Sequence, residues 1–248
     1  MRVIVTKDFE ETCKVAAGII ADVIAARPDA RLGLATGSTA KGVYPYLVQA
    51  YREGRLDFSR VSTVNLDEYV GLAPDHPQSY RHFMDENLFD RINIDKRNTI
   101  VAKGTGDIEE NVRAFRREIQ SRPIDIQLLG VGVDGHIGFN EPGKVLWDSA
   151  HVEELDQSTI DANARFFKDR SEVPARAISM GVGEIMRAKK LLLLATGRQK
   201  ANAVAGLLKN EELDAKNPAT MVKMHADATV VIDEEIAGLI GYDCKKTN

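Results

Sequence analysis

Short apolar runs alternate with helical hydrophobic patterns along the whole chain. Segments 8–27 and 107–120 each carry an apolar stripe at helical spacing, behind the candidate N-caps Asp8 and Asp107. The second stripe consists of Ile108, Val112, Phe115 and Ile119. Strands are predicted at residues 2–5, 32–35, 61–66, 124–129, 191–195 and 229–232. Further helices are predicted at residues 42–54, 78–90, 158–167, 181–188 and 198–209, and a short one at the end.

This alternation of strands and helices predicts the α/β class, with a central, mainly parallel sheet flanked by helices on both faces. We find no internal repeat, low-complexity tract or linker. One domain over residues 1–248 is therefore expected. Pro45 lies within the helical segment 42–54, and we expect it in the first turn, where its missing N–H is not needed.

Composition excludes several classes of protein. Lys and Arg number 33 against 37 Asp and Glu, and the net charge of −4 argues against nucleic-acid binding through bulk electrostatics. The two cysteines, Cys13 and Cys244, cannot form a disulfide framework or a four-cysteine zinc site. No apolar run approaches the ~20 residues of a membrane span, and the N-terminus lacks the pattern of a signal peptide. We expect a cytoplasmic protein without membrane contact.

Candidate chemistry lies after the predicted strands, because ligands of parallel α/β sheets bind at the carboxyl ends of the strands. Thr36, Gly37, Ser38 and Thr39 follow the second strand. They open a helix, whose N-terminal backbone N–H groups, together with the hydroxyls, suit an anion such as a phosphate. The Walker A spacing is absent, and a simple capped turn is the alternative interpretation.

Asp67 and Glu68 end the third predicted strand. A carboxylate at that edge of the sheet faces the ligand crevice, where partial desolvation raises its pKa toward that of a working base. The competing interpretation is an N-cap for the following segment.

A glycine-rich loop follows the strand 124–129. Residues 130–135 match G-x-G-x-x-G, but they lie midway along the chain and continue into a Gly- and Pro-containing stretch unsuited to a helix, which disfavours nicotinamide binding. Asp134, His136 and Glu141 lie within eight residues of one another. An imidazole between two carboxylates can transfer protons near neutral pH. No metal-ligand spacing such as H-E-x-x-H occurs, and we expect no metal.

Together these residues resemble the signatures of glucosamine-6-phosphate deaminases. The similarity rests mainly on the stretches 65–72 and 130–142, and extends to 34–39, 79–80, 163–167 and 197–200. It implies a Rossmann-like fold, no cofactor, and conversion of D-glucosamine 6-phosphate and water to D-fructose 6-phosphate and ammonium.

The resemblance also implies residue roles. Asp67 matches the base that enolises the substrate, and Asp134, His136 and Glu141 match the group that opens the sugar ring. In that group His136 takes the anomeric proton and returns one to the ring oxygen. The matching phosphate site consists of Gly37, Ser38, Thr39, Arg165 and Lys200. Residue type alone does not identify Arg165 and Lys200 as binding residues. Without the resemblance, each would be interpreted as a solvated surface charge.

Two other functions share this architecture. 6-Phosphogluconolactonases have a related loop but hydrolyse a lactone and need no C2 base; Tyr69 and Glu141 favour the deaminase. A non-catalytic sugar-phosphate sensor is the second alternative, and no helix-turn-helix segment or basic appendage supports it.

Regulation is expected to be absent. Hexameric members of the family bind the activator N-acetylglucosamine 6-phosphate through a serine and basic residues after the Glu-Pro pair. Here Lys144 replaces the serine, and His151, Glu153 and Glu154 follow. Adjacent carboxylates repel a phosphate. The C-terminal segment 234–248 also lacks the longer tail of allosteric members, so we expect a non-allosteric monomer.

Overall fold

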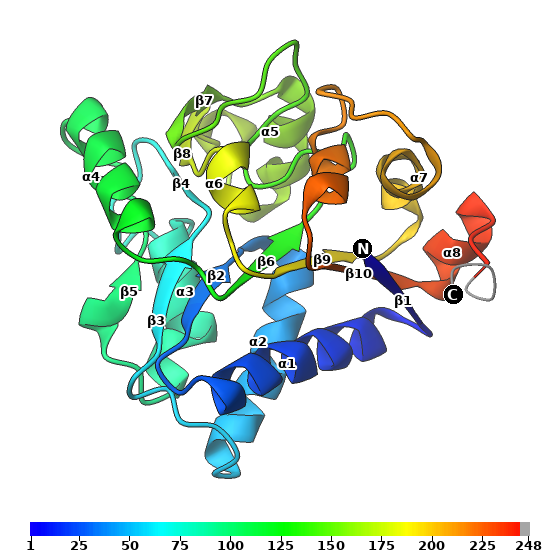
Figure 1. Cartoon of the computed structure of the whole chain (residues 1–248). Coiled ribbons are helices and arrows are strands. Elements are labelled where there is room, and N and C mark those ends of the chain that lie inside the picture. The colour runs from blue at the N-terminus through cyan, green and yellow to red at the C-terminus, as the bar shows by residue number, and fades with distance from the viewer. Residues whose placement is uncertain (244–248) are drawn as a thin grey trace.

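The computed structural model describes residues 1–243, and its central layer is a seven-stranded sheet (Figure 1). Its strands are β1 (Arg2–Thr6), β2 (Arg31–Leu34), β3 (Ser62–Asn65), β5 (Thr99–Ile100), β6 (Ile126–Gly130), β9 (Leu191–Ala195) and β10 (Ala228–Asp233). They lie in the order β1-β10-β9-β6-β2-β3-β5, and every neighbouring pair is parallel. The predicted α/β class with a parallel central sheet is confirmed.

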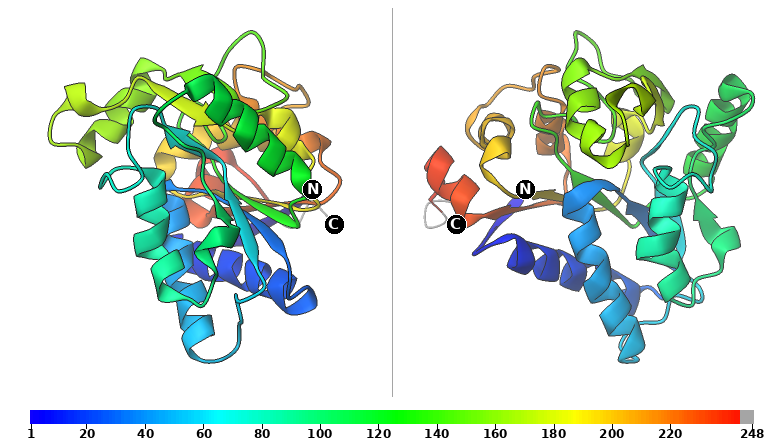
Figure 2. Two further views of the ribbon diagram at one scale, coloured as in Figure 1. Left: turned by 90° about the vertical axis from the view of Figure 1, so that its left-hand side faces the viewer. Right: turned by 180° about the vertical axis from the view of Figure 1, so that it is seen from behind.

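Helices cover both faces of this sheet. They are α1 (Phe9–Ala26), α2 (Gly37–Arg52), α3 (Tyr80–Asn87), α4 (Ile108–Ser121), α5 (Gln157–Asn163), α6 (Val182–Met186), α7 (Ala201–Lys209) and α8 (Glu234–Ile240). In Figure 1 α1 and α2 lie below the sheet, whereas α4, α6 and α7 lie above it; Figure 2 shows the same layers from the side and from behind. Asp8 and Asp107 are N-caps as predicted, each accepting a hydrogen bond from the backbone N–H three residues on.

A second, three-stranded antiparallel sheet lies above the central one and was not predicted. It consists of β4 (Asp67–Tyr69), β8 (Arg176–Ser179) and β7 (His151–Glu154), in that order. Leu66 joins β3 to β4 and accepts a hydrogen bond from the N–H of Met180, just after β8. The small sheet thereby ties the chain beyond β3 to the region above the carboxyl ends of the central strands.

The helical period over 42–54 was wrong about the start of the second helix, whereas the prediction that residues 36–39 open a helix is confirmed. α2 begins at Gly37, five residues earlier than expected, so Pro45 lies in the helix interior rather than in its first turn. Pro45 cannot donate to the carbonyl of Lys41, but the buried side chains of Tyr44 and Leu47 hold this part of the helix on the sheet. The early start places the N-terminus of α2 directly after β2.

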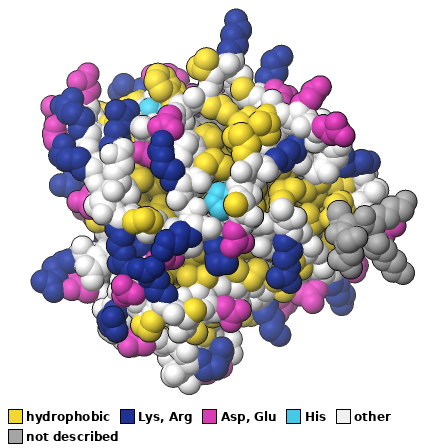
Figure 3. Space-filling view, viewed as in Figure 1, with side chains coloured by type: hydrophobic (Ala, Val, Ile, Leu, Met, Phe, Trp, Pro, Cys, Tyr) yellow, Lys and Arg dark blue, Asp and Glu magenta, His cyan; other side chains and the backbone are white. Residues whose placement is uncertain are grey.

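Cys13 is buried in the core as a packed residue, as expected, whereas Cys244 lies outside the described residues. Across the part of the chain that is described, no helix is both long enough and apolar enough to span a bilayer. Figure 3 shows Lys and Arg side chains interspersed with Asp and Glu on the face seen in Figure 1.

Candidate active site

A cavity of about 230 Å³ opens at the carboxyl ends of the central strands. Segments that follow β2, β3, β6 and β9 line it, as the strand-end rule predicts. Eight of the nine residues selected from the sequence line this cavity: Gly37, Ser38, Thr39, Asp67, Asp134, His136, Arg165 and Lys200. Glu141, the ninth, lies buried behind His136.

The loop between β2 and α2 forms one wall. Thr36 is the extended residue before the helix, and Gly37 has a φ of +88°, a conformation that glycine adopts without strain. Ser38 and Thr39 occupy the first turn, where backbone N–H groups have no partner within the helix. The N-terminus of α2 therefore presents N–H groups and hydroxyls to the cavity, as an anion requires.

The two acids of the Asp67–Glu68 pair have different surroundings, and neither is the N-cap of α3, which is Ser79. Successive side chains of a strand point to opposite faces, and only Asp67 faces the cavity. Glu68 points away and accepts backbone N–H groups at the start of α3. Burial, reinforced by the charge of Glu68 and opposed by that of His136, raises the pKa of Asp67 to about 7. Asp67 is therefore a stronger base than an ordinary carboxylate.

The glycine-rich loop does not open a helix, so the dinucleotide-binding alternative fails on its structural context. After β6 the chain turns at Gly135, whose φ is +95°, and residues 131–150 contain no helix. An added Cβ on Gly135 would lie 2.2 Å from Oδ1 of Asn217. The glycine thus lets this loop pack against the segment before residues 218–224.

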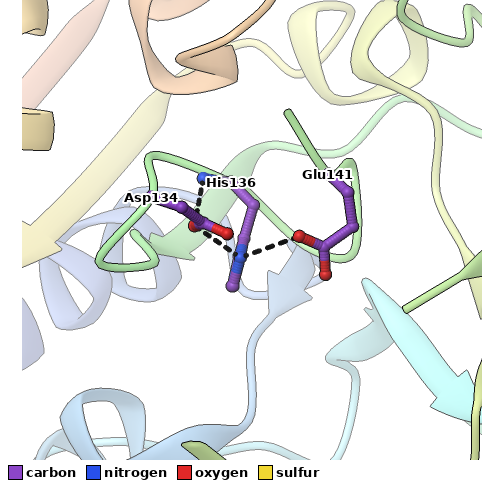
Figure 4. Close-up of side chains that lie close together, drawn as sticks. All are labelled: Asp134, His136 and Glu141. Carbon is purple, nitrogen blue, oxygen red and sulfur yellow. Dashed lines mark hydrogen bonds and ion pairs between the residues drawn. The ribbon is translucent and has the colours of Figure 1, made fainter. Parts of the chain in front are cut away.

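Asp134, His136 and Glu141 form a compact triad (Figure 4). Nδ1 of His136 lies 2.9 Å from Oδ1 of Asp134 and 3.5 Å from Oε2 of Glu141. The backbone N–H of His136 also donates to Oδ1 of Asp134, at 3.1 Å. Because both carboxylates meet the ring at Nδ1, Nε2 is the ring nitrogen left for a substrate.

The triad keeps its imidazole charged. Burial alone would lower the pKa of His136, but the contacts with Asp134 and Glu141 outweigh burial and raise it to about 9. The same contacts hold the pKa of Asp134 below its usual value, against the effect of burial. The three ligand atoms lie within 4.8 Å of one another and could hold a divalent ion. Such an ion would have to displace the proton of His136, because an imidazole that binds a metal must be neutral.

Two cations complete the cavity. Arg165 lies in a short 3-10 helix after α5, with its guanidinium 4.7 Å above the ring of Phe166. Lys200 follows β9, and its ammonium donates to the backbone carbonyl of Val131. Burial and the positive charge of Arg165 lower the pKa of Lys200, so an anion between them relieves their repulsion.

Sequence reasoning missed the aromatic floor of the cavity. Tyr80 lies at the start of α3 and stacks on Phe139, with ring centroids 6.0 Å apart and planes at 10°. Both line the cavity, and Tyr69 packs on both rings from behind. Tyr80 directly follows Ser79, the N-cap of α3, and this position was the sequence signal that could have identified it. Asn163, at the end of α5, lines the cavity as well.

Comparison with known proteins agrees with this geometry. Residues 8–231 match the model of the family described as glucosamine-6-phosphate isomerases/6-phosphogluconolactonase. The chain belongs to this family. A glucosamine-6-phosphate deaminase of Thermoanaerobacter pseudethanolicus is 50% identical over 242 residues, which cover 97% of this chain and 95% of that one.

Solved structures separate the two branches of the glucosamine-6-phosphate isomerase/6-phosphogluconolactonase family. A monomeric glucosamine-6-phosphate deaminase superimposes with a TM-score of 0.93 at 41% identity, over 96% of this chain and all of that chain. A 6-phosphogluconolactonase from Trypanosoma cruzi reaches a TM-score of 0.73 at 19% identity, over 96% of each chain. The second likeness shows a shared fold alone.

Proposed function

We propose that this chain is a glucosamine-6-phosphate deaminase, which converts D-glucosamine 6-phosphate and water to D-fructose 6-phosphate and ammonium. One observation carries the proposal: a buried base, Asp67, and a charged imidazole, His136, share a single cavity with an anion site. An isomerisation that begins from a closed sugar needs both proton carriers, whereas lactone hydrolysis does not need the first. The 50% identity to a glucosamine-6-phosphate deaminase supports the same function.

In the first stage the sugar ring opens. The charged His136 gives its proton to the ring oxygen as the bond from that oxygen to C1 breaks. The anomeric hydroxyl becomes the C1 carbonyl, and its proton returns to the imidazole. The two transfers leave His136 as it began, and the carboxylates of Asp134 and Glu141 stabilise its charge throughout.

In the second stage Asp67 removes the C2 proton of the open aldehyde. The electron pair of that bond forms a C1–C2 double bond, and His136, which served the anomeric oxygen in the first stage, gives its proton to the C1 oxygen. Asp67 then returns its proton to C1, which leaves an iminium at C2. Water adds to C2 and ammonia departs, so C2 becomes the ketone of fructose 6-phosphate, and the proton released in this step returns to the imidazole. A pKa near 7 lets Asp67 accept and return the proton with similar ease.

The phosphate takes no part in these steps. Gly37, Ser38 and Thr39 bind it through backbone N–H groups and hydroxyls at the N-terminus of α2, and Arg165 and Lys200 bind it through charge. Holding the far end of the sugar places C2 beside Asp67. Such positioning supplies several kcal/mol of the barrier reduction, on the order of that seen in intramolecular reactions.

An assay of products tests the function. The purified protein is incubated with glucosamine 6-phosphate, and ammonium and fructose 6-phosphate are measured by separate coupled enzymes. We expect the two products in equal amounts, and no ammonium from glucose 6-phosphate, which lacks the amine. Hydrolysis of 6-phosphogluconolactone without ammonium release would favour the lactonase. Binding of the amino sugar phosphate without turnover would favour the sensor.

The remaining expectations belong to the same proposal. We infer a monomer, which the 41% identity to a monomeric deaminase supports. One catalytic domain spans residues 1–248, and the enzyme works in the cytoplasm, where sugar phosphates are made and consumed. It requires no metal or organic cofactor, since Asp67 and His136 carry every proton transfer that the reaction needs. Light scattering tests the monomeric state, and activity after treatment with a chelator tests whether a metal is required.

A further inference from the structure

Glu68 is a buried carboxylate next to the candidate base and outside the cavity. Its residue is 2% exposed, and its side chain points to the opposite face of β4 from Asp67. We propose that Glu68 is a positioning residue that anchors Tyr80 at the cavity and keeps Asp67 a strong base. The inference rests on the proposed deaminase function, in which Asp67 removes the C2 proton.

The anchoring role follows from three hydrogen bonds. Oε1 of Glu68 accepts the backbone N–H groups of Tyr69 and Tyr80 at 2.8 and 2.9 Å, and Oε2 accepts that of Arg81 at 2.9 Å. Tyr80 and Arg81 begin α3, where N–H groups have no partner within the helix and favour a negative charge. One carboxylate thus joins β4 to the first turn of α3.

This junction sets the position of a cavity-lining ring. The backbone of Tyr80 is held by Glu68, while its side chain lines the cavity and stacks on Phe139. The Tyr80 hydroxyl lies beside the side chains of Tyr69 and Thr36. A shift of the start of α3 would therefore displace the ring of Tyr80 from Phe139 at the cavity. It would also disturb the contact of Tyr80 with Thr36, in the loop between β2 and α2.

The electrostatic role follows from what faces Asp67. On its own strand these groups are Glu68 and Tyr69; from the elements packed against it they are His136 of the triad loop, Tyr80 of α3 and Tyr44 of α2. The tyrosines stay neutral because their pKa values are raised.

Two charges therefore act on Asp67 with opposite signs. The negative charge of Glu68 raises the pKa of Asp67, and the charge of His136 lowers it. Burial raises the pKa of Glu68 itself to about 7, against the three backbone hydrogen bonds that favour its charged form, so the two carboxyls titrate together in this range. The guanidinium of Arg81 pairs with Asp85 and Thr99 instead. Removing the charge of Glu68 should make Asp67 a weaker base.

The test compares two isosteric substitutions. Glu68→Gln removes the charge, and Glu184→Gln is the matched control. Glu184 is also 2% exposed and accepts backbone N–H groups, from Ala150 at 2.7 Å and from Gly181 at 3.4 Å, but it does not line the cavity. The readouts are kcat, KM and the pH profile of kcat/KM on glucosamine 6-phosphate, together with thermal unfolding.

For Glu68→Gln we expect kcat to fall about tenfold or more and the acid limb of the profile to move down by about one pH unit. The alkaline limb, which His136 sets, should stay in place. Titration of the substrate amine is common to all variants and cancels in the comparison. For Glu184→Gln we expect both limbs in the wild-type position and kcat within about twofold, whatever its loss of thermal stability.

The outcomes separate the inference from the function. If the wild-type enzyme releases ammonium but Glu68→Gln changes kcat and the acid limb no more than Glu184→Gln does, Glu68 is only structural and the inference is wrong. If the wild type is inactive on this substrate, the proposed function itself fails. Should Glu68→Gln not fold, Glu68→Asp decides: it keeps the charge but shortens the reach to α3. Glu68→Asp should retain the acid limb and lose kcat, and wild-type kcat in that variant would overturn the anchoring role.

Discussion

Charged side chains are buried in opposite ways at the two ends of the central strands. The side of the sheet where the strands begin is called the amino edge here, and the side where they end is called the carboxyl edge. At the amino edge Asp125 precedes β6 and lies beside Arg31, the first residue of β2. Both oxygens of Asp125 have partners: Oδ2 accepts the backbone N–H of Arg31 at 2.8 Å, and Oδ1 pairs with Lys189 at 2.8 Å and with Arg27 at 3.1 Å. Although burial acts against them, these contacts lower the pKa of Asp125.

At the carboxyl edge two acids, Glu141 and Asp67, are buried without such partners. Among residues 1–243, neither carboxylate oxygen of Glu141 has a hydrogen-bond partner, and the ring of His136 lies 3.5 Å from it. Asp67 is 6% exposed, and burial raises its pKa to about 7. A buried carboxylate that has hydrogen-bond and ion-pair partners stabilises the fold. A buried carboxylate without them lowers stability but is more reactive. The difference separates an edge with paired charges from the edge that carries the candidate active site.

The largest expected effect is that of Asp67→Asn, which should separate activity from stability. Loss of a positioned base lowers kcat by about 10²–10⁴-fold. Between the ordinary Asp pKa of 3.8 and about 7, the folded state holds a proton on Asp67 that the unfolded state has released. The free energy of unfolding therefore falls as pH rises through this window, and the loss persists above it. Asn removes that penalty.

Denaturant titration at pH 8 should consequently show Asp67→Asn to be more stable than the wild type by about 1–3 kcal/mol. The two forms should converge in stability at pH 4. A variant that is both inactive and less stable at pH 8 would place Asp67 among the structural charges and break the comparison of the two edges.

His136→Gln should affect ring opening more than isomerisation. The imidazole is the group that Asp134 and Glu141 keep charged, and Gln cannot carry a proton between the ring oxygen and the anomeric oxygen. We expect kcat to fall by about 10²-fold on glucosamine 6-phosphate. An analogue without the C4 and C5 hydroxyls, which can close into neither a furanose nor a pyranose ring, should restore part of the activity relative to wild type. An equal loss on both substrates would remove His136 from the ring-opening step.

The cations at the carboxyl edge should affect binding. Arg165→Ala and Lys200→Ala should each raise KM about 10- to 100-fold, because a hydrogen bond to a charged group contributes about 1.5–3 kcal/mol. Inorganic phosphate should compete with substrate in the wild type. Arg198→Ala is the control, since Arg198 is near Lys200 in sequence but does not line the cavity. An unchanged KM in both variants would place the phosphate elsewhere.

The amino edge should respond in stability alone. Asp125→Asn keeps one acceptor for the N–H of Arg31 but loses the charge that Lys189 and Arg27 contact. Because those two cations are about half exposed, we expect a loss of only about 1–2 kcal/mol at pH 7, with unchanged kcat and KM. The contribution of Asp125 is present above its ordinary pKa and disappears as pH falls through its lowered one, so the variants should converge in acid. A change in KM would contradict the division between the edges.

The sequence was sufficient to predict the parallel core and the gathering of the candidate residues at the carboxyl ends of its strands. Regular apolar strands such as β9 and capped helices such as α4 follow local rules, and the strand-end rule then selects Asp67 and His136. Arg165 and Lys200 came only from the family resemblance, because an isolated cation has no pattern. Their proximity becomes visible only in the fold.

The small antiparallel sheet could not be predicted from its strands. β7 and β8 have four residues each, and β4 has three. Partners distant in sequence rather than local pattern determine their pairing. The surroundings of Glu68 were hidden for the same reason, since both interpretations of the Asp67–Glu68 pair were drawn from one strand end. Only the position of α3 beside β4 shows that the two acids have different partners.

The smallest expected effect is none: N-acetylglucosamine 6-phosphate should not change the kinetics. In the segment that matches the activator site of hexameric relatives, both ring nitrogens of His151 already have partners and are not available to a phosphate. Its Nε2 lies 2.8 Å from Glu153, its Nδ1 lies 3.2 Å from the carbonyl of Ser149, and Trp147 stacks on its ring. A phosphate placed there would meet the carboxylate of Glu153. Initial rates should be hyperbolic and unchanged by the activator, with light scattering showing a monomer throughout. Sigmoidal rates that the activator makes hyperbolic, in a hexamer, would show that this segment binds phosphate after all.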